Sequence, residues 1–183
     1  MQGKERDDRL RHLYDQVESN LKYVGATAIE DKLQDGVPET IRVLKEAGIN
    51  LWMLTGDKLE TALEIARSCA LIDGRNTVEI SMVADDRETL RQRIDAELKY
   101  MALKEMVAED ERVAIIVNGL TLQLIFQSAS VTRDFFSLCR QSRCVVCCQL
   151  SPKQKSDIVE HYMKAGIGVC AAIGDGGNDA PMI

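Results

Sequence analysis

The chain has 183 residues, which corresponds to roughly one domain at about 150 residues per domain. Its 45% hydrophobic and 28% charged residues are ordinary for a folded globular protein and argue against intrinsic disorder. Lys and Arg total 23 and Asp and Glu total 29, and the resulting net charge of −6 argues against a general nucleic-acid-binding protein, which normally carries a concentrated basic patch.

The first half of the chain predicts alternating helices and strands. Apolar residues at helical spacing from Leu10 to Leu21 indicate an amphipathic helix, and the apolar stretch from Tyr23 to Ile29 is typical of a strand. Asp35 is expected to cap a helix from about Val37 to Ala47. The continuous apolar run Ile49 to Leu54 predicts a strand buried on both faces of a parallel sheet, and a helix is expected to follow it.

Residues 73 to 112 are polar and rich in charge, and we expect them to form an insertion or surface excursion from the sheet. This segment is predicted to contain a long helix with one apolar stripe, formed by Leu90, Ile94, Leu98, Met101 and Met106.

Strands and helices alternate again in the last part of the chain. Predicted strands cover Val113 to Val117, Cys144 to Cys148 and Ile167 to Ile173, and a helix opened by Ser151 covers Pro152 to Lys164. Repeated alternation of this kind predicts an α/β fold with a mostly parallel sheet.

Two features bear on cellular location. Val113 to Thr132 carries no charge, but polar residues interrupt it too often for a membrane span of about 20 apolar residues. The charged start of the chain does not have the pattern of a signal peptide, and most of the six cysteines lie in apolar runs. We therefore expect a reducing, cytosolic environment.

Three polar clusters directly follow predicted strands: Thr55-Gly56-Asp57, Ser151 to Lys155, and Gly174 to Asp179. If the strands are parallel, these clusters converge on one rim of the sheet, where ligands of open α/β sheets bind. A hydroxyl and free backbone N–H groups in the first cluster suit a phosphate. Lys155 adds a positive charge, and the closely spaced carboxylates Asp175 and Asp179 suit magnesium. Together they indicate phosphoryl-transfer chemistry.

Each cluster also has a simpler explanation. A Thr-Gly-Asp turn caps many ordinary helices, a lysine in a first helical turn is usually solvated, and Gly- and Asp-rich loops are often plain turns. The occurrence of all three in order, each after a strand, favours the functional interpretation. Cys144-x-x-Cys147 resembles half of a zinc site, but its apolar strand setting favours burial in the core.

These motifs resemble the haloacid dehalogenase-like phosphorylation domain of P-type ATPases, and within that group the phospholipid flippases. The narrower resemblance rests on three stretches, which are Ala28-Ile29-Glu30-Asp31-Lys32-Leu33-Gln34, Trp52 through Ala62, and Cys147-Cys148-Gln149-Leu150-Ser151-Pro152. Ion pumps of the same group have an Asp-Pro-Pro sequence in place of Asp31-Lys32-Leu33, and flippases usually carry Arg at the position of Gln149.

The resemblance implies a role for each matching residue. Thr55, Lys155 and Asp175 would be catalytic, with Thr55 on the phosphoryl group and Lys155 neutralising its charge. Magnesium would bind Asp175 and Asp179, and Asp31 would order the hinge and the nucleotide. The implied ATP-binding set is Thr55, Gly56, Asp57, Gln149, Lys155, Asn178 and Asp179.

The resemblance also implies an organisation. Residues 1–27 would end the preceding nucleotide-binding region, and 28–183 would form the C-terminal part of a Rossmann-like phosphorylation domain with a helical polar insertion at about 73–112. The family's nucleophile lies in an Asp-Lys-Thr-Gly-Thr motif on the first strand of the domain, and this sequence contains no such motif. We therefore expect a part of a larger protein that is incomplete for catalysis by itself.

The implied function is ATP-driven movement of phospholipid between membrane leaflets through an aspartyl-phosphate. Expected partners are ATP, the phospholipid, a membrane reached through segments outside this chain, and an accessory subunit, with this segment on the cytosolic side and no nucleic acid bound. Two alternatives are a soluble phosphatase of the same superfamily, and a non-catalytic module that binds magnesium or nucleotide.

Overall fold

The computed structural model describes residues 2–27, 32–73, 77–107, 112–166 and 168–183. The chain divides into two units, Met1–Lys32 and Leu33–Ile183. The first unit contains helix α1 (Gln2–Val17), which overlaps the helix predicted from Leu10 to Leu21 but begins earlier and ends at Val17. The predicted strand Tyr23 to Ile29 is wrong over its described part, because residues 23–27 are irregular and Val24 is 96% exposed. An apolar run forms a strand only where another strand offers backbone partners, and none of the described strands pairs with this run.

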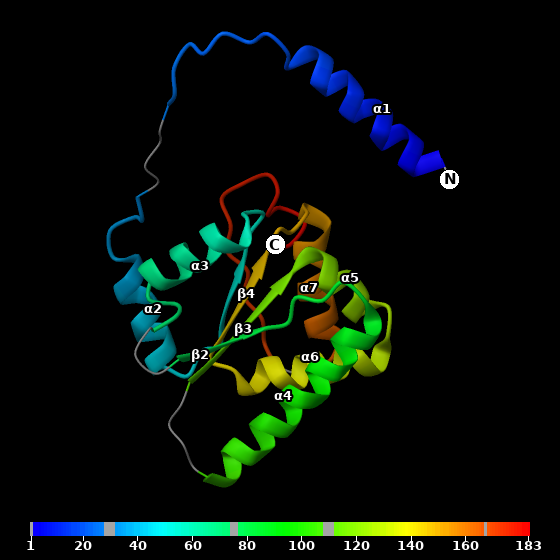
Figure 1. The fold of residues 1–183 in the computed structure, drawn as a ribbon. Helices are drawn as coiled ribbons and strands as arrows, with labels where there is room; N and C mark the ends of the chain where they lie inside the picture. The colour runs from blue at the N-terminus through cyan, green and yellow to red at the C-terminus, as the bar shows by residue number, and fades with distance from the viewer. Residues whose placement is uncertain (1, 28–31, 74–76, 108–111, 167) are drawn as a thin grey trace. The chain divides into compact units, whose positions relative to one another are not determined.

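The second unit is an α/β fold built on a four-stranded sheet in the order β1-β4-β3-β2 (Figure 1). Its strands are β1 (Leu51–Leu54), β2 (Thr77–Ser81), β3 (Arg112–Asn118) and β4 (Cys144–Cys148). All three pairings are parallel, which confirms the predicted fold class.

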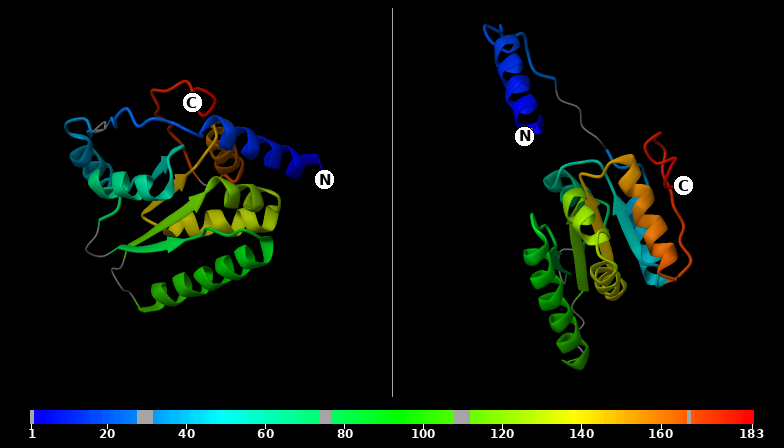
Figure 2. Two further views of the ribbon diagram at one scale, coloured as in Figure 1. Left: turned by 45° about the horizontal axis from the view of Figure 1, so that its top comes forward. Right: turned by 90° about the vertical axis from the view of Figure 1, so that its right-hand side faces the viewer.

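Helices cover both faces of the sheet (Figures 1 and 2). One face packs against α2 (Val37–Glu46) and α3 (Leu59–Ser68). The other face packs against α4 (Arg87–Val107), α5 (Gly119–Phe126), α6 (Ala129–Gln141) and α7 (Pro152–Lys164). The side chains of β3 and β4 alternate between the two cores, as the two-residue period of a strand requires.

The order of the strands explains why the helices change face. From β1 the chain crosses to β2 at the far edge, and it then returns stepwise through β3 to β4. Crossovers between parallel strands are almost always right-handed, so reversing the direction of travel moves the connecting helix to the other face. The helix after β1 and the helix after β4 therefore lie on opposite sides of the sheet.

Most predicted elements are confirmed, with small shifts at their ends. The helix expected from about Val37 begins after Gly36 rather than Asp35, because Gly36 adopts a left-handed backbone (φ 83°) that favours glycine. Ser151 caps α7 as predicted. No helix among the described residues is long and apolar enough to cross a membrane.

The polar segment 73–112 contains more than the predicted helix. Its long helix is α4, whose apolar stripe buries Leu90, Ile94 and Met101. It also supplies β2, which pairs with β3 at the edge of the sheet. The sequence of β2, Thr-Val-Glu-Ile-Ser, alternates apolar and polar residues in the way expected of a half-exposed strand.

The predicted last strand, Ile167 to Ile173, is wrong over its described part. Residues 168–173 are irregular, and Val169 and Ile173 are exposed. Strand β1 is an edge strand, and within the described part of the chain its free edge pairs with no other segment. A β-prone sequence without a hydrogen-bonding neighbour does not become a strand.

The larger core is centred on Phe136, which is 2% exposed and lies against four aromatic rings. These rings belong to Trp52, Phe126, Phe135 and Tyr162, with centroids 5.7–6.5 Å from that of Phe136.

We expect Phe136→Ala to lower the free energy of unfolding by about 3–5 kcal/mol, because the site cannot collapse around so large a void. Urea unfolding measures this. Leu120→Ala, at a position 67% exposed, is the matched control and should change stability by less than about 0.5 kcal/mol.

The six cysteines differ sharply in expected reactivity. Cys170 is exposed and the other five are buried. Burial raises the pKa of the Cys144 thiol to about 11, so only on the order of one molecule in a thousand carries its thiolate near pH 8.

Alkylation of the native protein at that pH, followed by mass spectrometry, should modify Cys170 alone, and all six thiols should react in urea. Rapid native modification of Cys144 would contradict this packing.

Candidate functional site

The carboxyl ends of β1 and β4 form a topological switch point. The two strands are neighbours in the sheet, but α3 leaves β1 toward one face and α7 leaves β4 toward the other. The loops after the two strands begin at this switch point, and open α/β sheets bind ligands at such a place. The loop after β1 contains Thr55-Gly56-Asp57, and the loop after β4 leads to Lys155.

The first loop is a hydrogen-bonded turn around the Thr55 hydroxyl. That hydroxyl donates to Asp57 Oδ2 at 2.7 Å and accepts the backbone N–H of Asp57 at 3.1 Å. Gly56 and Asp57 are exposed, and α3 begins two residues after Asp57. The turn thus presents a hydroxyl and backbone N–H groups close to a helix N-terminus, where an anion is favoured.

Backbone hydrogen bonds join the first loop to the second. The N–H of Gln149 donates to the Asp57 carbonyl at 2.8 Å, and the N–H of Leu150 donates to the Thr55 carbonyl at 3.0 Å. Gln149 makes this connection in a left-handed conformation (φ 54°), which is uncommon for a residue with a side chain. Its side chain is exposed. The two loops are therefore joined to each other at the carboxyl ends of β1 and β4.

Gln154 supports the second loop, a role that our sequence analysis missed. Its Oε1 accepts the backbone N–H of Ser151 at 2.9 Å, and the Ser151 hydroxyl accepts the N–H of Gln154 in return. The Gln154 Nε2 also donates to the Gly119 carbonyl at 2.7 Å, which ties α7 to the start of α5. The Ser-x-x-Gln spacing of a capping box was the available signal.

Lys155 is held by a buried ion pair. It lies in the first turn of α7 and is 5% exposed, and its Nζ lies 2.6 Å from Asp179 Oδ1. A buried charge requires such a partner. The hydrogen bond from Lys155 lowers the pKa of Asp179, and the backbone N–H of Gly176 acts in the same direction. This contact brings the third predicted cluster to the second.

Glycines allow the third cluster to fold tightly around Asp179. A Cβ added at Gly174 would lie 2.3 Å from the Asp179 Cβ, and one added at Gly176 would lie 2.3 Å from Asn178 Oδ1. Asn178 and Asp175 are exposed. Within the described part of the chain, the Asp175 carboxylate holds no hydrogen bond or ion pair, so its oxygens face solvent without competition.

The structure thus connects the three clusters by hydrogen bonds and one ion pair. Thr55, Gly56, Asp57, Gln149, Lys155 and Asp179 belong to this connected set, and Asn178 lies beside Asp179. Asp175 is on the same loop, and its backbone N–H helps to lower the pKa of Asp179, whereas its own carboxylate holds no hydrogen bond or ion pair among the described residues. Asp31 and most of its motif lie outside the described residues. No three His, Cys, Asp or Glu side chains among those described are grouped so that they could hold a metal ion.

Comparison with known families agrees with this topology. Residues 2–119 match the family described as haloacid dehalogenase-like hydrolase. The chain belongs to this family. Its parallel sheet with helices on both faces is the corresponding architecture.

Curated relatives give a narrower similarity over nearly the whole chain. A phospholipid-transporting ATPase of Schizosaccharomyces pombe is 40% identical over 180 residues, which is 98% of this chain and 14% of that protein. Phospholipid-transporting ATPase 2 of Arabidopsis thaliana is 39% identical over 179 residues, 98% of this chain and 16% of that protein. The phospholipid-transporting ATPase DNF1 of Saccharomyces cerevisiae is 37% identical over 203 residues, 97% of this chain and 13% of that protein. The chain thus spans about one seventh of the length of the relatives that it matches.

Gly119 is packed so closely that a side chain should disturb the candidate site. A Cβ there would lie 2.6 Å from the Gln149 carbonyl oxygen and 3.0 Å from the Gln154 amide, and backbone cannot move aside cheaply. We expect Gly119→Ala to lower the free energy of unfolding by about 1–3 kcal/mol and to shift the amide resonances of Gln149 and Ser151. Gly25→Ala, where a Cβ meets nothing within 4 Å, is the control. Wild-type stability and unshifted resonances in Gly119→Ala would contradict the packing described here.

Proposed function

We propose that this chain is part of a P-type phospholipid-transporting ATPase, in which it binds the phosphates of ATP and supports phosphoryl transfer to an aspartate. The observation that carries the proposal is the connection of three phosphate- and metal-suited loops at the switch point between β1 and β4. The similarity of 97–98% of the chain to proteins named phospholipid-transporting ATPases supports the choice of substrate.

The proposed catalytic residues are Thr55, Lys155 and Asp175. The N–H groups of the Thr55 turn would hydrogen-bond the phosphoryl oxygens, as donors at a helix N-terminus do, and the Thr55 hydroxyl would join them by exchanging its bond to Asp57 Oδ2 for one to the phosphate. Lys155 would neutralise phosphate charge, because its ammonium has three N–H donors and Asp179 occupies one of them. Gly56, Asp57, Gln149, Asn178 and Asp179 would complete the contacts to ATP.

Magnesium is the metal that fits the donor set. Asp175 offers an exposed carboxylate without a competing partner, and Asp179 lies on the same glycine-rich loop. Mg²⁺ is typically held by one or two carboxylates together with water and substrate phosphates, so two aspartates suffice on the protein side. When bound, the ion would neutralise the charge that develops during phosphoryl transfer.

The remaining parts of the proposal concern the larger protein. The phospholipid substrate, the membrane, an accessory subunit and a cytosolic position of this segment all rest on the similarity to transporters. The attacking carboxylate would come from outside this sequence, because the 183 residues contain no Asp-Lys-Thr-Gly-Thr motif. Nucleophilic catalysis requires that group, so the chain alone should form no acyl-phosphate.

A chimera tests the proposal directly. The matching stretch of the yeast phospholipid-transporting ATPase DNF1 is replaced by this chain, and phosphoenzyme from γ-labelled ATP and uptake of fluorescent phospholipid are measured. We expect both activities to persist. Asp175→Asn should reduce phosphoenzyme at limiting magnesium at least about tenfold, because even residues that only support metal ligands cost that much.

Asp157→Asn is the matched control, because Asp157 lies on α7 and pairs with the exposed Lys153 rather than with the site. It should leave phosphoenzyme formation unchanged. Wild-type phosphoenzyme in Asp175→Asn would refute the magnesium assignment, and phosphoenzyme without phospholipid uptake would refute the substrate. Acyl-phosphate or phosphatase activity on the chain alone would favour the soluble phosphatase.

A further inference from the structure

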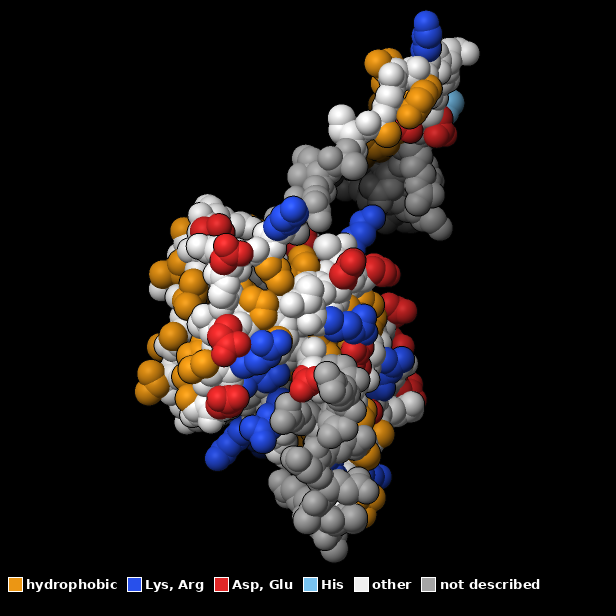
Figure 3. Space-filling model, turned by 90° about the vertical axis from the view of Figure 1, so that its left-hand side faces the viewer, with side chains coloured by type: hydrophobic (Ala, Val, Ile, Leu, Met, Phe, Trp, Pro, Cys, Tyr) orange, Lys and Arg blue, Asp and Glu red, His pale blue; other side chains and the backbone are white. Residues whose placement is uncertain are grey.

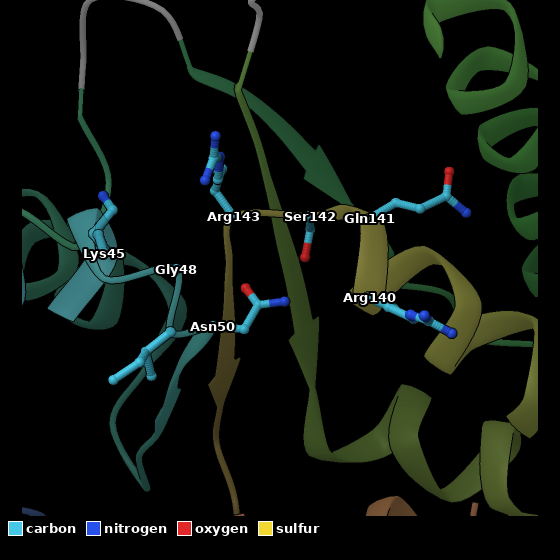
Figure 4. Close-up of a pocket in the computed structure, with 8 residues that line it drawn as sticks. Lys45, Gly48, Asn50, Arg140, Gln141, Ser142 and Arg143 are labelled. Carbon is cyan, nitrogen blue, oxygen red and sulfur yellow. The ribbon is translucent and has the colours of Figure 1, made fainter. Parts of the chain in front are cut away.

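A polar hollow of about 360 Å³ lies at the opposite end of β1 and β4 from the candidate site (Figure 4). It is lined by residues that immediately precede the two strands and by the ends of α2 and α6. Strands of four and five residues, at about 3.3 Å per residue, place the two ends roughly 15 Å apart. The hollow is therefore separate from the loops that follow the strands.

Three of the eight residues that line the hollow are cationic, and none is acidic. Lys45 comes from α2, Arg140 from the last turn of α6, and Arg143 from the residue before β4. Neither arginine holds an ion pair or a side-chain hydrogen bond within the part of the chain that the structure describes. Both are exposed, and the Arg140 side chain, which points away from Lys45 and Asn50 in Figure 4, would turn toward them to meet a shared anion.

The positive charge outweighs the local helix dipoles. The carboxyl-terminal ends of α2 and α6 both lie at the hollow, and each contributes roughly half a negative charge. Three full positive charges therefore exceed the partial negative charges of these two helix ends. On the face drawn in Figure 3, Lys and Arg side chains lie among Asp and Glu side chains, whereas the residues lining the hollow include no acidic residue.

The hollow also has fixed polar walls. Lys45 Nζ donates to the carbonyl oxygens of Ala70 and Leu71 at 3.1 and 3.0 Å, which positions the ammonium and leaves one N–H free. The buried Ser142 hydroxyl donates to the Cys139 carbonyl at 2.8 Å. Asn50 is exposed and points toward Ser142 across the gap between the two strands (Figure 4), so its amide adds a neutral donor.

We propose that this hollow binds a phosphate-bearing anion. A phosphate carries more than one charge and several acceptor oxygens, which can engage one ammonium and two guanidinium groups together, whereas a single carboxylate satisfies one of them. The shared chemistry is a phosphate group, supplied by a soluble phosphate compound or by a phospholipid headgroup. The assignment is independent of the proposed transport function.

Pyrophosphate in magnesium-free buffer is the probe for a soluble ligand. Titrated into the 15N-labelled 183-residue chain, it should shift the amide resonances of Gly48, Asn50 and Arg143. The double variant Arg140→Gln/Arg143→Gln should weaken the binding at these amides at least about tenfold, because charge-assisted hydrogen bonds dominate it. The double variant Arg133→Gln/Arg42→Gln removes the same charge from α6 and α2 outside the hollow and should bind as the wild type does.

Cosedimentation with phosphatidylcholine vesicles, with and without phosphatidylserine, is the second arm. A lipid headgroup would be identified if the wild type and the control variant bind the anionic vesicles and Arg140→Gln/Arg143→Gln does not. Binding of pyrophosphate without binding of vesicles would identify a soluble phosphate. Both results support the site. Equal affinity of both double variants for the probes, or no shift at Gly48, Asn50 and Arg143 together with no vesicle binding, would overturn it. Shifts confined to Thr55 and Gly56 would also overturn it, because they place the anion at the other end of the strands.

Discussion

Strand β4 is the element on which the rest of the second unit depends. It is buried along its whole length and pairs on one side with β1 and on the other with β3. The carbonyl of Cys147 accepts the N–H of Thr55, and the chain after Cys148 continues directly into the loop that holds Lys155. One loop of the candidate site therefore continues from β4 and the other is hydrogen-bonded to it, so a displacement of β4 would move both.

Small apolar side chains suit this position, which explains three cysteines in five residues. Cys147 packs in the core beneath α4–α7, whereas Cys144 and Cys148 pack in the core beneath α2 and α3. Cys144 and Cys147 therefore point to opposite faces of the sheet and cannot bind the same metal ion. Burial raises the pKa of the thiols of Cys144, Cys147 and Cys148, which keeps them neutral in the packed core. Their role is packing.

The parts of the fold that were predictable are those in which local pattern and tertiary environment agree. A run such as Cys144–Cys148 is apolar enough for burial on both faces, and Ser151 with Gln154 specifies the start of α7 locally. The stretches at 23–27 and 168–173 have equally apolar sequences, but a strand also needs a partner, and the sequence of one segment does not contain that information. In the same way, Thr55 and Lys155 were identifiable from their strands, whereas the support of Gln154 by Gly119 depends on residues 35 positions apart.

The ion pair between Lys155 and Asp179 explains how the candidate site accommodates a buried ammonium group. A lysine that is 5% exposed would lose most of its hydration, and only a close carboxylate makes that position tolerable. Gly174 and Gly176 leave room for Asp179 to approach Lys155, because a Cβ at either position would clash within the loop. The glycine-rich loop thereby helps to fix the position of Lys155, although it lies about 20 residues further along the chain. Asp179 uses one of the three ammonium N–H groups, so under the proposed function a phosphate would meet donors that this pair already orients. Orientation in advance lowers the cost of binding, since little further ordering of the lysine side chain is required.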